Sequence, residues 1–590
     1  MKKFLFVPLV ALALGSCSTD ENQINNGETG NGDESRSYAS ITLASPRGAA
    51  SRAPGYNEDD YEYGSANENN VNSIRFYFFY ADGQPTPVAK QAGTNSYVSY
   101  VDWTPAASDL TTGDPDGTTV EKIVKITVGI NQPAGSQHPN LVLAVINPPA
   151  SLTSYSGTLN LSNVKNLVAD YYTGLHNDNF VITNTAYVDG NSNIISATPI
   201  TENHLKPSQD DPTLQTLIIY VERVLARIDL QLNLTNNAIT VTPTDGSSSY
   251  TIYQVSEQQV NGDETDIYMR LLGWNVAQFT NTSRLVKDIN IWPSNLFGDL
   301  EPWNISEYHR SFWAINPQNV EYTYNTFVNV PGTDYPYASE LPIPANGSKA
   351  DPVYIQENAA DYESAKTGSG ASHPTSLVFA AQLVDVNGNP LPLVKWANKY
   401  YTQSGVLNSI ANSLNLWSKT TTTQDGTSGV LFTHITPADL QFVSAETLYG
   451  QEGLPDDVAE YFTFVQLSST AQSKEWYTGN TPESASISVN EVNSMILQGV
   501  GSLYVWNEGE SYYYIDIRHL GEEGAPGYVG IVRNHIYNVN LTNIEGLGTP
   551  IFNPDEVFHP QVPTTDENII SAEVRILQWR VVSQDYNISW

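Results

Sequence analysis

The sequence predicts a mainly β protein that forms two β-sandwich domains with a few short helices. Short segments rich in β-branched and aromatic residues recur along the chain, and turn signals such as Asp82-Gly83 and Asn387-Gly388 follow several of them. Helical stretches are few and short, and we assign them to Ser162–Asp170 and Val406–Trp417, where apolar residues recur at helical spacing. Many short strands separated by turns, without a fixed-period repeat, favour sandwiches over solenoids.

Composition excludes several classes of protein. The chain has 590 residues, of which 40% are hydrophobic and 11% aromatic, so it can build cores and is not globally disordered. Its 27 basic and 63 acidic residues give a formal net charge of −36, which argues against nucleic acid as a partner. Cys17 is the single cysteine, so no intramolecular disulfide can form.

The N-terminus reads as an export signal that occupies residues 1–16. A cationic start is followed by the apolar run Phe4–Leu14, which is too short to span a membrane. The segment Leu14-Gly15-Ser16-Cys17 then matches the bacterial lipobox, with an apolar residue, two small residues and a cysteine. We therefore expect cleavage between Ser16 and Cys17 and a lipid on the Cys17 thiol. The alternative is an ordinary signal peptide with an incidental cysteine.

Residues 17–52 read as a polar tether followed by a removable first strand. Tyr38–Leu43 alternates polar and apolar residues with the period of a strand. Arg47 and Arg52 follow among small residues, as expected of a loop that a trypsin-like protease could cut. We predict the cut between Arg52 and Ala53, with Arg47 and Gly48 as the alternative pair and a plain linker as the other reading.

The remainder divides into an N-terminal sandwich over residues 53–235, a C-terminal sandwich over 236–570 and a terminal strand over 571–590. The polar stretch Thr235–Ser249 suggests the boundary between the two sandwiches. The strands expected from the sequence pattern are Val71–Tyr80, Lys122–Ile130, Leu141–Ile146, Leu217–Leu234, the hairpin Leu383–Leu391, Tyr512–Ile517, Val529–Leu541 and Ala572–Val582.

Signatures of catalysis and of metal binding are missing from the sequence. It contains no H-E-x-x-H, G-x-S-x-G, P-loop or G-x-G-x-x-G motif, although a carboxylate pair that meets only in the fold stays open. His309, His519 and His535 lie among strand residues and are interpreted as structural. Asp114–Gly117 and Asp263–Asp266 are interpreted as acidic turns rather than calcium loops. We therefore expect no enzyme activity, no cofactor and no metal.

The C-terminal tail is unusually apolar for a chain terminus. Its apolar residues change phase along the segment, which predicts either a β-bulge or a strand that leaves its sheet. One reading is a donor strand that pairs with another subunit, and the other is the last core strand of its own domain. The residues assigned to the donor strand are Leu577, Trp579, Val581, Tyr586, Ile588 and Trp590.

Several segments in order resemble the type V fimbrial shaft subunits of Bacteroidales, most closely the minor-fimbria major subunit of Porphyromonas. The acidic residues after Cys17 also resemble the surface-export signal of Bacteroidetes lipoproteins. The segments that carry the family resemblance are Ser37–Leu43, Leu141–Pro148, Tyr220–Ile228, Leu272–Asn275, His309–Ala314, Gln356–Asn358, Gly527–Pro550 and Ala572–Asp585.

This resemblance implies two transthyretin-like, Greek-key sandwiches and an assembly mechanism. A lipidated precursor reaches the outer membrane, a maturation protease removes the first strand, and the C-terminal strand of another subunit fills the groove. The implied partners are identical subunits head to tail, the fimbrial tip and anchor subunits, the protease and, before cleavage, the membrane. The product would be an extracellular fimbrium with a role in adhesion and biofilm. A monomeric surface lipoprotein that binds glycans is the alternative, and a glycoside hydrolase on a β scaffold is a third reading.

Overall fold

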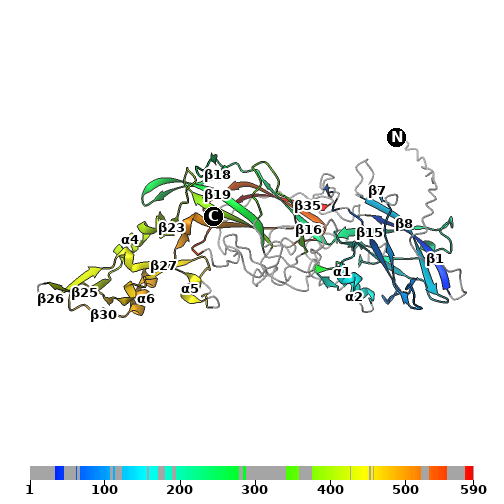
Figure 1. The fold of residues 1–590 in the computed structure, drawn as a ribbon, viewed down its shortest axis with the longest axis horizontal. Coiled ribbons are helices and arrows are strands. Elements are labelled where there is room, and N and C mark those ends of the chain that lie inside the picture. Colours follow the sequence, from blue (N-terminus) through cyan, green and yellow to red (C-terminus); the bar gives the residue numbers. More distant parts are fainter. Residues whose placement is uncertain are drawn as a thin grey trace, which may run out of the picture.

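The computed structural model describes residues 34–44, 61–62, 65, 67–68, 70–106, 110–112, 122–155, 159–165, 167–169, 180–185, 187–188, 194–277, 283–287, 341–357, 375–424, 427–450, 453–455, 458–517, 519, 531–553 and 579–588. The molecule is elongated, with the N-terminal sheet at one end and a lobe that carries the hairpin of β25 and β26 at the other (Figure 1). No helix among these residues is long and apolar enough to cross a membrane. The mainly β class predicted from the sequence is confirmed.

A nine-stranded sheet forms the N-terminal part. Apolar side chains on one face of its strands join a large core, and β3 is buried along its whole length. Side chains on the other face of β3 and β9 pack against the short helices α1 (Ala150–Thr153) and α2 (Leu161–Lys165). The strand order is β6 (Tyr100–Trp103), β3 (Ile74–Phe79), β9 (Leu141–Ile146), β11 (Ile182–Asn184), β15 (Thr216–Arg223), β1 (Glu34–Ala44), β8 (Lys122–Pro133) and β7 (Leu110–Thr112), with β14 (Thr198–Pro199) beside β9.

Two further sheets share the same core and form the middle of the molecule. The five-stranded sheet has the order β2 (Tyr61–Glu62), β35 (Trp579–Ile588), β33 (His535–Ile544), β16 (Leu225–Leu232) and β21 (Val353–Gln356). The nine-stranded sheet has the order β31 (Tyr504–Trp506), β23 (Leu393–Trp396), β24 (Lys399–Tyr401), β18 (Tyr250–Val260), β19 (Asp263–Ala277), β22 (Ser376–Val384), β32 (Glu510–Asp516) and β34 (Thr549–Pro550), with β17 (Ala238–Val241) on β18.

The distal lobe has a separate core between helices and small sheets. Its helices are α4 (Gln403–Ser413), α5 (Ala445–Tyr449) and α6 (Val489–Val500). Its strands are β26 (Thr427–His434), β25 (Trp417–Gln424), β29 (Glu475–Tyr477) and β30 (Ser486–Ile487) in one sheet, and β27 (Leu440–Ser444) with β28 (Thr463–Leu467) in another.

The remaining elements are short. Three two-residue pairs are formed by β4 (Ala89–Lys90) with β5 (Tyr97–Val98), β10 (Val168–Ala169) with β20 (Ser283–Arg284), and β12 (Tyr187–Val188) with β13 (Ile194–Ile195). The 3₁₀ turns are η4 (Glu202–His204), η6 (Pro437–Asp439), η7 (Ala471–Ser473) and η8 (Asn507–Gly509).

The apolar run Leu217–Leu234 is extended, as predicted, but it supplies two strands to two sheets. β15 pairs with β11 and β1, whereas β16 pairs with β21 and β33. The chain therefore changes sheets at Val224, because β15 and β16 have different partner strands. The domain boundary expected at residue 235 stays a prediction.

The helix expected over Val406–Trp417 is shifted toward the N-terminus. α4 begins at Gln403, where Thr402 caps it by accepting a hydrogen bond from the Gly405 N–H, and it ends at Ser413. Trp417 belongs to β25 and packs edge-on against His434, so its helical spacing was misleading. The predicted helix Ser162–Asp170 is also shorter, because α2 ends at Lys165 and β10 follows.

Candidate functional site

The first strand is an integral part of the N-terminal sheet. Strand β1 runs antiparallel to β8, with Glu34 opposite Pro133 and Ala44 opposite Ile123. On its other side it runs parallel to β15, with Ser40 opposite Thr216. The sequence predicted this strand over Tyr38–Leu43, and the structure extends it at both ends.

Side chains of β1 alternate between the core and the outer face, as the period of two requires. Ser37, Ala39 and Ile41 are buried, and Ile41 is 0% exposed. Tyr38 and Ser40 on the other face are half-buried, and the Ser40 hydroxyl lies 3.3 Å from that of Thr216. The strand therefore contributes side chains to the core as well as backbone pairing.

β1 occupies a seat that is formed by its two neighbouring strands, β8 and β15, and this seat is strongly apolar. Ile41 lies opposite Ile126 on β8 and Leu217 on β15, and Ala39 lies opposite Val128. All of these residues belong to the same buried core. Full burial of a large apolar side chain is worth about 1.5–3 kcal/mol, so the seat favours an apolar strand over water.

A second backbone contact holds the N-terminal half of β1. The Tyr38 N–H donates to the Lys206 carbonyl at 2.7 Å, and the Lys206 N–H donates back to Tyr38 at 3.1 Å. Lys206 follows the turn η4, whereas β15 begins at Thr216, so two separate segments line this side of the strand. The sequence carried no signal for the Lys206 contact, because it depends on a loop far away in the chain.

Without β1, the two flanking strands would have unpaired backbone edges with an apolar gap between them. Unpaired edges are templates for pairing with another chain, and exposed apolar surface adds to that tendency. The arrangement is therefore able to bind an extended apolar segment by strand addition.

Most of the predicted processing residues lie outside the described part of the chain. These are Ser16, Cys17, Arg47, Gly48, Arg52 and Ala53, together with Leu577 and Trp590 of the tail. Their predicted roles stay predictions.

The remaining tail residues assigned to the donor strand, Trp579, Val581, Tyr586 and Ile588, lie on β35. This strand pairs in parallel with β33 of its own chain, from His535 opposite Arg580 to Ile544 opposite Ile588. A register shift occurs between Leu541 and Asn543, opposite Tyr586 and Asn587, so the extra residue lies on β33 and the bulge predicted in the tail is not present in β35. The short strand β2 pairs with the other edge of β35.

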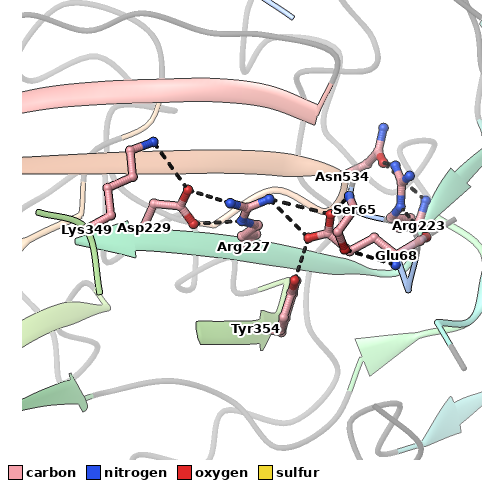
Figure 2. Close-up of polar contacts among 8 residues, drawn as sticks. All are labelled: Ser65, Glu68, Arg223, Arg227, Asp229, Lys349, Tyr354 and Asn534. Atoms are coloured by element: carbon pink, nitrogen blue, oxygen red, sulfur yellow. Dashed lines mark hydrogen bonds and ion pairs between the residues drawn. The ribbon is translucent and has the colours of Figure 1, made fainter. Parts of the chain in front are cut away.

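A buried acidic residue, Glu68, anchors the chain just after β2 (Figure 2). Its side chain is fully buried and accepts hydrogen bonds from the Tyr354 hydroxyl and the Ser65 N–H, both at 2.5 Å. Arg227 donates to it at 3.2 Å, and Arg223 donates to its backbone carbonyl at 2.9 Å. Glu68 therefore links the segment after β2 to β15, β16 and β21.

The same network continues along β16. Arg227 makes two hydrogen bonds of 2.7 Å with the Asp229 carboxylate, and Lys349 lies 3.8 Å from that carboxylate. Burial alone would lower the pKa of Arg227, but its hydrogen bonds and ion pairs with Asp229 and Glu68 raise it above the ordinary value. Burial and the Glu68 carboxylate raise the pKa of Tyr354. Arg227 is thus charged and Tyr354 neutral at neutral pH, so both can donate to the carboxylates of the network.

A second buried polar cluster lies where the N-terminal and five-stranded sheets meet. The Arg533 guanidinium is fully buried and donates to Glu357 at 2.8 Å and to the Leu285 carbonyl at 2.9 Å. Lys287 lies 3.8 Å from Glu222 at the end of β15 and 4.0 Å from Glu357. Buried charges require such partners, and breaking one pair leaves an uncompensated charge. Sequence reasoning missed both clusters because their members are widely separated single residues.

The predicted structural histidines behave as expected where they are described. His519 is hydrogen-bonded to the Tyr537 hydroxyl at 2.9 Å, and His535 contacts the Arg533 carbonyl at 2.7 Å. The acidic turn predicted at Asp263–Asp266 is wrong, because these residues are the first four of strand β19 and pair with β18, and the turn lies just before them at Asn261 and Gly262. His309 and Asp114–Gly117 lie outside the described residues. Within the described ranges, no group of three or more His, Cys, Asp or Glu residues could hold a metal ion.

An open groove of about 800 Å³ lies between the β18–β19 hairpin, β24 and α4. Tyr400, Tyr401, Gln258, Glu264 and Lys399 are among its lining residues. Burial raises the pKa of the Tyr400 hydroxyl. Amides, carboxylates and tyrosines are groups that contact sugars, so a test of the glycan-binding alternative would begin at this groove.

Comparison with known proteins gives one family match. Residues 504–585 match the family described as major fimbrial subunit protein type IV, fimbrillin, C-terminal. The match confirms the resemblance to fimbrial subunits. It covers β31, β32, β33 and most of β35, and it supports a structural rather than an enzymatic protein. A search of curated proteins found no match.

Three solved structures are similar to the chain at low identity. A fimbrilin from Porphyromonas gingivalis has 12% identity and a TM-score of 0.33, covering 94% of this chain and 98% of its own. The tip fimbrial protein Mfa3 from the same organism, with a C-terminal truncation, has 14% identity and a TM-score of 0.26, covering 59% and 79%. A fimbrial assembly protein from Parabacteroides distasonis has 10% identity and a TM-score of 0.27, covering 68% and 97%.

Proposed function

We propose that the chain is the shaft subunit of a cell-surface fimbria that polymerises by donor-strand exchange. The precursor is exported as a lipoprotein anchored at Cys17, and a protease cuts it after Arg52. Strand β1 then leaves the N-terminal sheet, and the C-terminal strand of another subunit enters the vacated seat. Repeating this contact head to tail without closure gives a filament.

The position of β1 is the observation that carries this proposal. β1 is the first of the described strands in the sequence, yet it lies between β15 and β8 in the sheet and contributes Ile41 to the core. The predicted cleavage residues follow shortly after its end at Ala44. A cut there would disconnect β1 from the domain while β8 and β15 stay connected to the rest of the chain.

The C-terminal strand is the complementary part. In the described state, β35 pairs with β33 and β2 of its own chain, so its use as a donor requires it to leave these partners. Among the described residues, β2 pairs with it through Tyr61 and Glu62, whereas β33 pairs along its length. The tail would then be the last strand of its own domain before assembly and the donor strand in another subunit after it.

Cleavage by trypsin in solution, followed by gel electrophoresis with and without heating, tests the proposal. The cleaved wild type should give a ladder of oligomers that resists SDS without heating, although the chain can form no disulfide. The Arg47→Ala/Arg52→Ala precursor, which lacks both arginines of the loop, should stay monomeric because β1 still fills its seat. Arg36→Ala is the matched control, since this arginine precedes the predicted cut and lies exposed on β1.

Two results would contradict parts of the proposal. A mature N-terminus at Gly48 would show that Arg47 is the residue cut. Monomers after complete removal of β1 would refute donor-strand exchange itself. Normal surface fimbriae from Cys17→Ala cells would separately refute the lipoprotein route.

A further inference from the structure

The groove between the β18–β19 hairpin, β24 and α4 has a row of hydrogen-bonding side chains along one wall. Gln259 of β18 lies opposite Glu264 of β19, so their side chains share one face of the hairpin. On its other side β18 pairs with β24, where Val260 lies opposite Tyr400. The same register places Lys399 beside Gln259 on that face. A carboxylate, an amide and an ammonium group thus lie in line across three strands.

The three side chains of this row are available to a ligand. All are exposed, and none makes a hydrogen bond or an ion pair with another described residue. Neighbouring strands lie about 4.8 Å apart, which separates the strand of Glu264 from that of Lys399 by about 10 Å. The row therefore offers acceptors at one end and donors at the other, with Gln259, which does both, between them.

The walls of the groove are fixed to each other by Asn261. Its amide donates to the Thr402 hydroxyl at 3.1 Å, and its Oδ1 accepts from the Thr402 N–H at 3.3 Å. The Thr402 hydroxyl also caps α4 by accepting from the Gly405 N–H. A Cβ on Gly405 would overlap Asn261 Oδ1, so the glycine permits this close approach of helix and hairpin. The groove is therefore preformed, which spares a ligand the cost of ordering it.

The chemistry of the lining excludes several classes of ligand. No aliphatic residue is among the described lining residues, so a lipid or an apolar peptide would find little matching surface. The charged members are Glu257, Glu264 and Lys399, so the lining is close to neutral. Anionic ligands would meet two carboxylates on a chain with a net charge of −36, and strongly cationic ones would meet Lys399. The ligand that fits is neutral and carries both donors and acceptors.

We propose that this groove binds a neutral oligosaccharide. Each sugar hydroxyl both donates and accepts, so neighbouring hydroxyls of one ring can bond Glu264 and Gln259 while another reaches Lys399. The rings of Tyr400 and Tyr401, which also line the groove, offer flat apolar surface to the C–H groups of a sugar. Because the hydrogen bonds of the row are open to water, binding at a single site is weak, with a dissociation constant of about 1 mM.

In a filament, which rests on the proposed function, every subunit would carry one such site. None of the described lining residues belongs to β1, β8, β15 or β35, so donor-strand exchange does not use them. Many weak sites on one filament raise the effective concentration of each toward a surface that displays many copies of the glycan. The shaft would then adhere tightly although each groove binds weakly.

Saturation-transfer NMR of the uncleaved, unlipidated precursor, Cys17→Ala, tests the site without polymerisation, because β1 still occupies its seat. The probes are neutral oligosaccharides of glucose, galactose, mannose and N-acetylglucosamine, with a sialylated oligosaccharide and a polylysine peptide beside them. At least one neutral probe should give a saturable signal. The double variant Gln259→Ala/Glu264→Ala should weaken its binding by about tenfold or more, since two hydrogen-bonding partners of the sugar are lost.

The control is Glu483→Ala, because Glu483 is an exposed carboxylate of the distal lobe outside the groove. It should bind like the parent precursor, and both variants should melt at the parent temperature, since exposed polar side chains contribute little to stability. Absence of a saturable signal from every neutral probe overturns the proposal, as does unchanged binding by the double variant. Binding of only the sialylated probe or only the peptide also overturns it. The SDS-resistant ladder of the cleaved protein is read separately, so a failure of this site is distinguishable from a failure of the proposed function.

Discussion

Strand β1 is a core strand of the precursor but should be irrelevant to the mature subunit, and Ile41→Ala separates the two states. Ile41 is fully buried between β8 and β15, so its truncation removes apolar contacts and leaves a cavity. Isoleucine to alanine in a core costs about 2–5 kcal/mol. We take about 3 kcal/mol, which for a domain of this size lowers the melting temperature by about 6–12 °C.

Differential scanning calorimetry of the precursor and of the cleaved, polymerised protein measures this difference. The variant precursor should melt earlier than the wild type, while variant and wild-type polymers should melt together, because β1 has left both. Ser40→Ala is the matched control, since this side chain lies on the opposite face of the same strand. An equal loss in precursor and polymer would show that β1 stays in place and would refute the reasoning.

Three further predictions concern buried or shifted charges. Arg533→Ala should lower the free energy of unfolding by about 3–5 kcal/mol in urea, because it removes the guanidinium that is hydrogen-bonded to the buried Glu357 carboxylate. Glu68→Gln should cost about 1–3 kcal/mol in the same assay, since the hydrogen bonds from Arg227 and Tyr354 lose their charged acceptor. Burial, and then the neighbouring carboxylate of Glu508, raise the pKa of Glu510 from 4.5 to about 7. Stability should therefore fall as the pH rises from about 4.5 to 7, because the unfolded chain loses its proton first. A difference of this size corresponds to about 3 kcal/mol, reduced to about 1 kcal/mol because the side chain is partly exposed. Glu510→Gln should remove that slope in melts across this range.

Local pattern predicted the elements whose burial is uniform. Leu141–Ile146 is β9, with the bounds expected from its apolar run, and β3 lies within Val71–Tyr80. The Asn387-Gly388 turn is present as well, with Gly388 at a φ of +83° that favours glycine. In each case the residues that decide the conformation are neighbours in sequence.

Helix α6 was missed although its signal was present. Ser488 and Glu491 form a capping box, in which each side chain accepts a hydrogen bond from the other residue's backbone. Val492, Ile496 and Val500 then recur at a spacing of four and are buried. A search for caps before the search for strands would have found this helix.

Features that depend on distant partners could not be predicted from pattern. The break at Val224 is set by strands β21 and β33, which lie far along the chain from it. The Glu68 network combines Ser65, Arg227 and Tyr354, each of which is unremarkable in its own sequence context. Non-local pairings carry no local signature, because only the finished fold brings these residues together.

The two buried polar clusters could keep the strands on either side of β1 in place after β1 is lost. Glu68 lies after the predicted cut, and the hydrogen bond that its backbone carbonyl accepts from Arg223 holds the end of β15. Glu222, also at the end of β15, lies 3.8 Å from the buried Lys287. Lys287 in turn lies 4.0 Å from Glu357, which is paired with Arg533. One wall of the seat is thus fixed by buried charges that remain in the cleaved chain, while the other wall, β8, keeps its pairing with β7. Removing β1 would then cost its own apolar contacts and backbone bonds but not the geometry of the walls. A preformed seat spares an incoming strand the cost of ordering it, which favours tight and slowly reversible association.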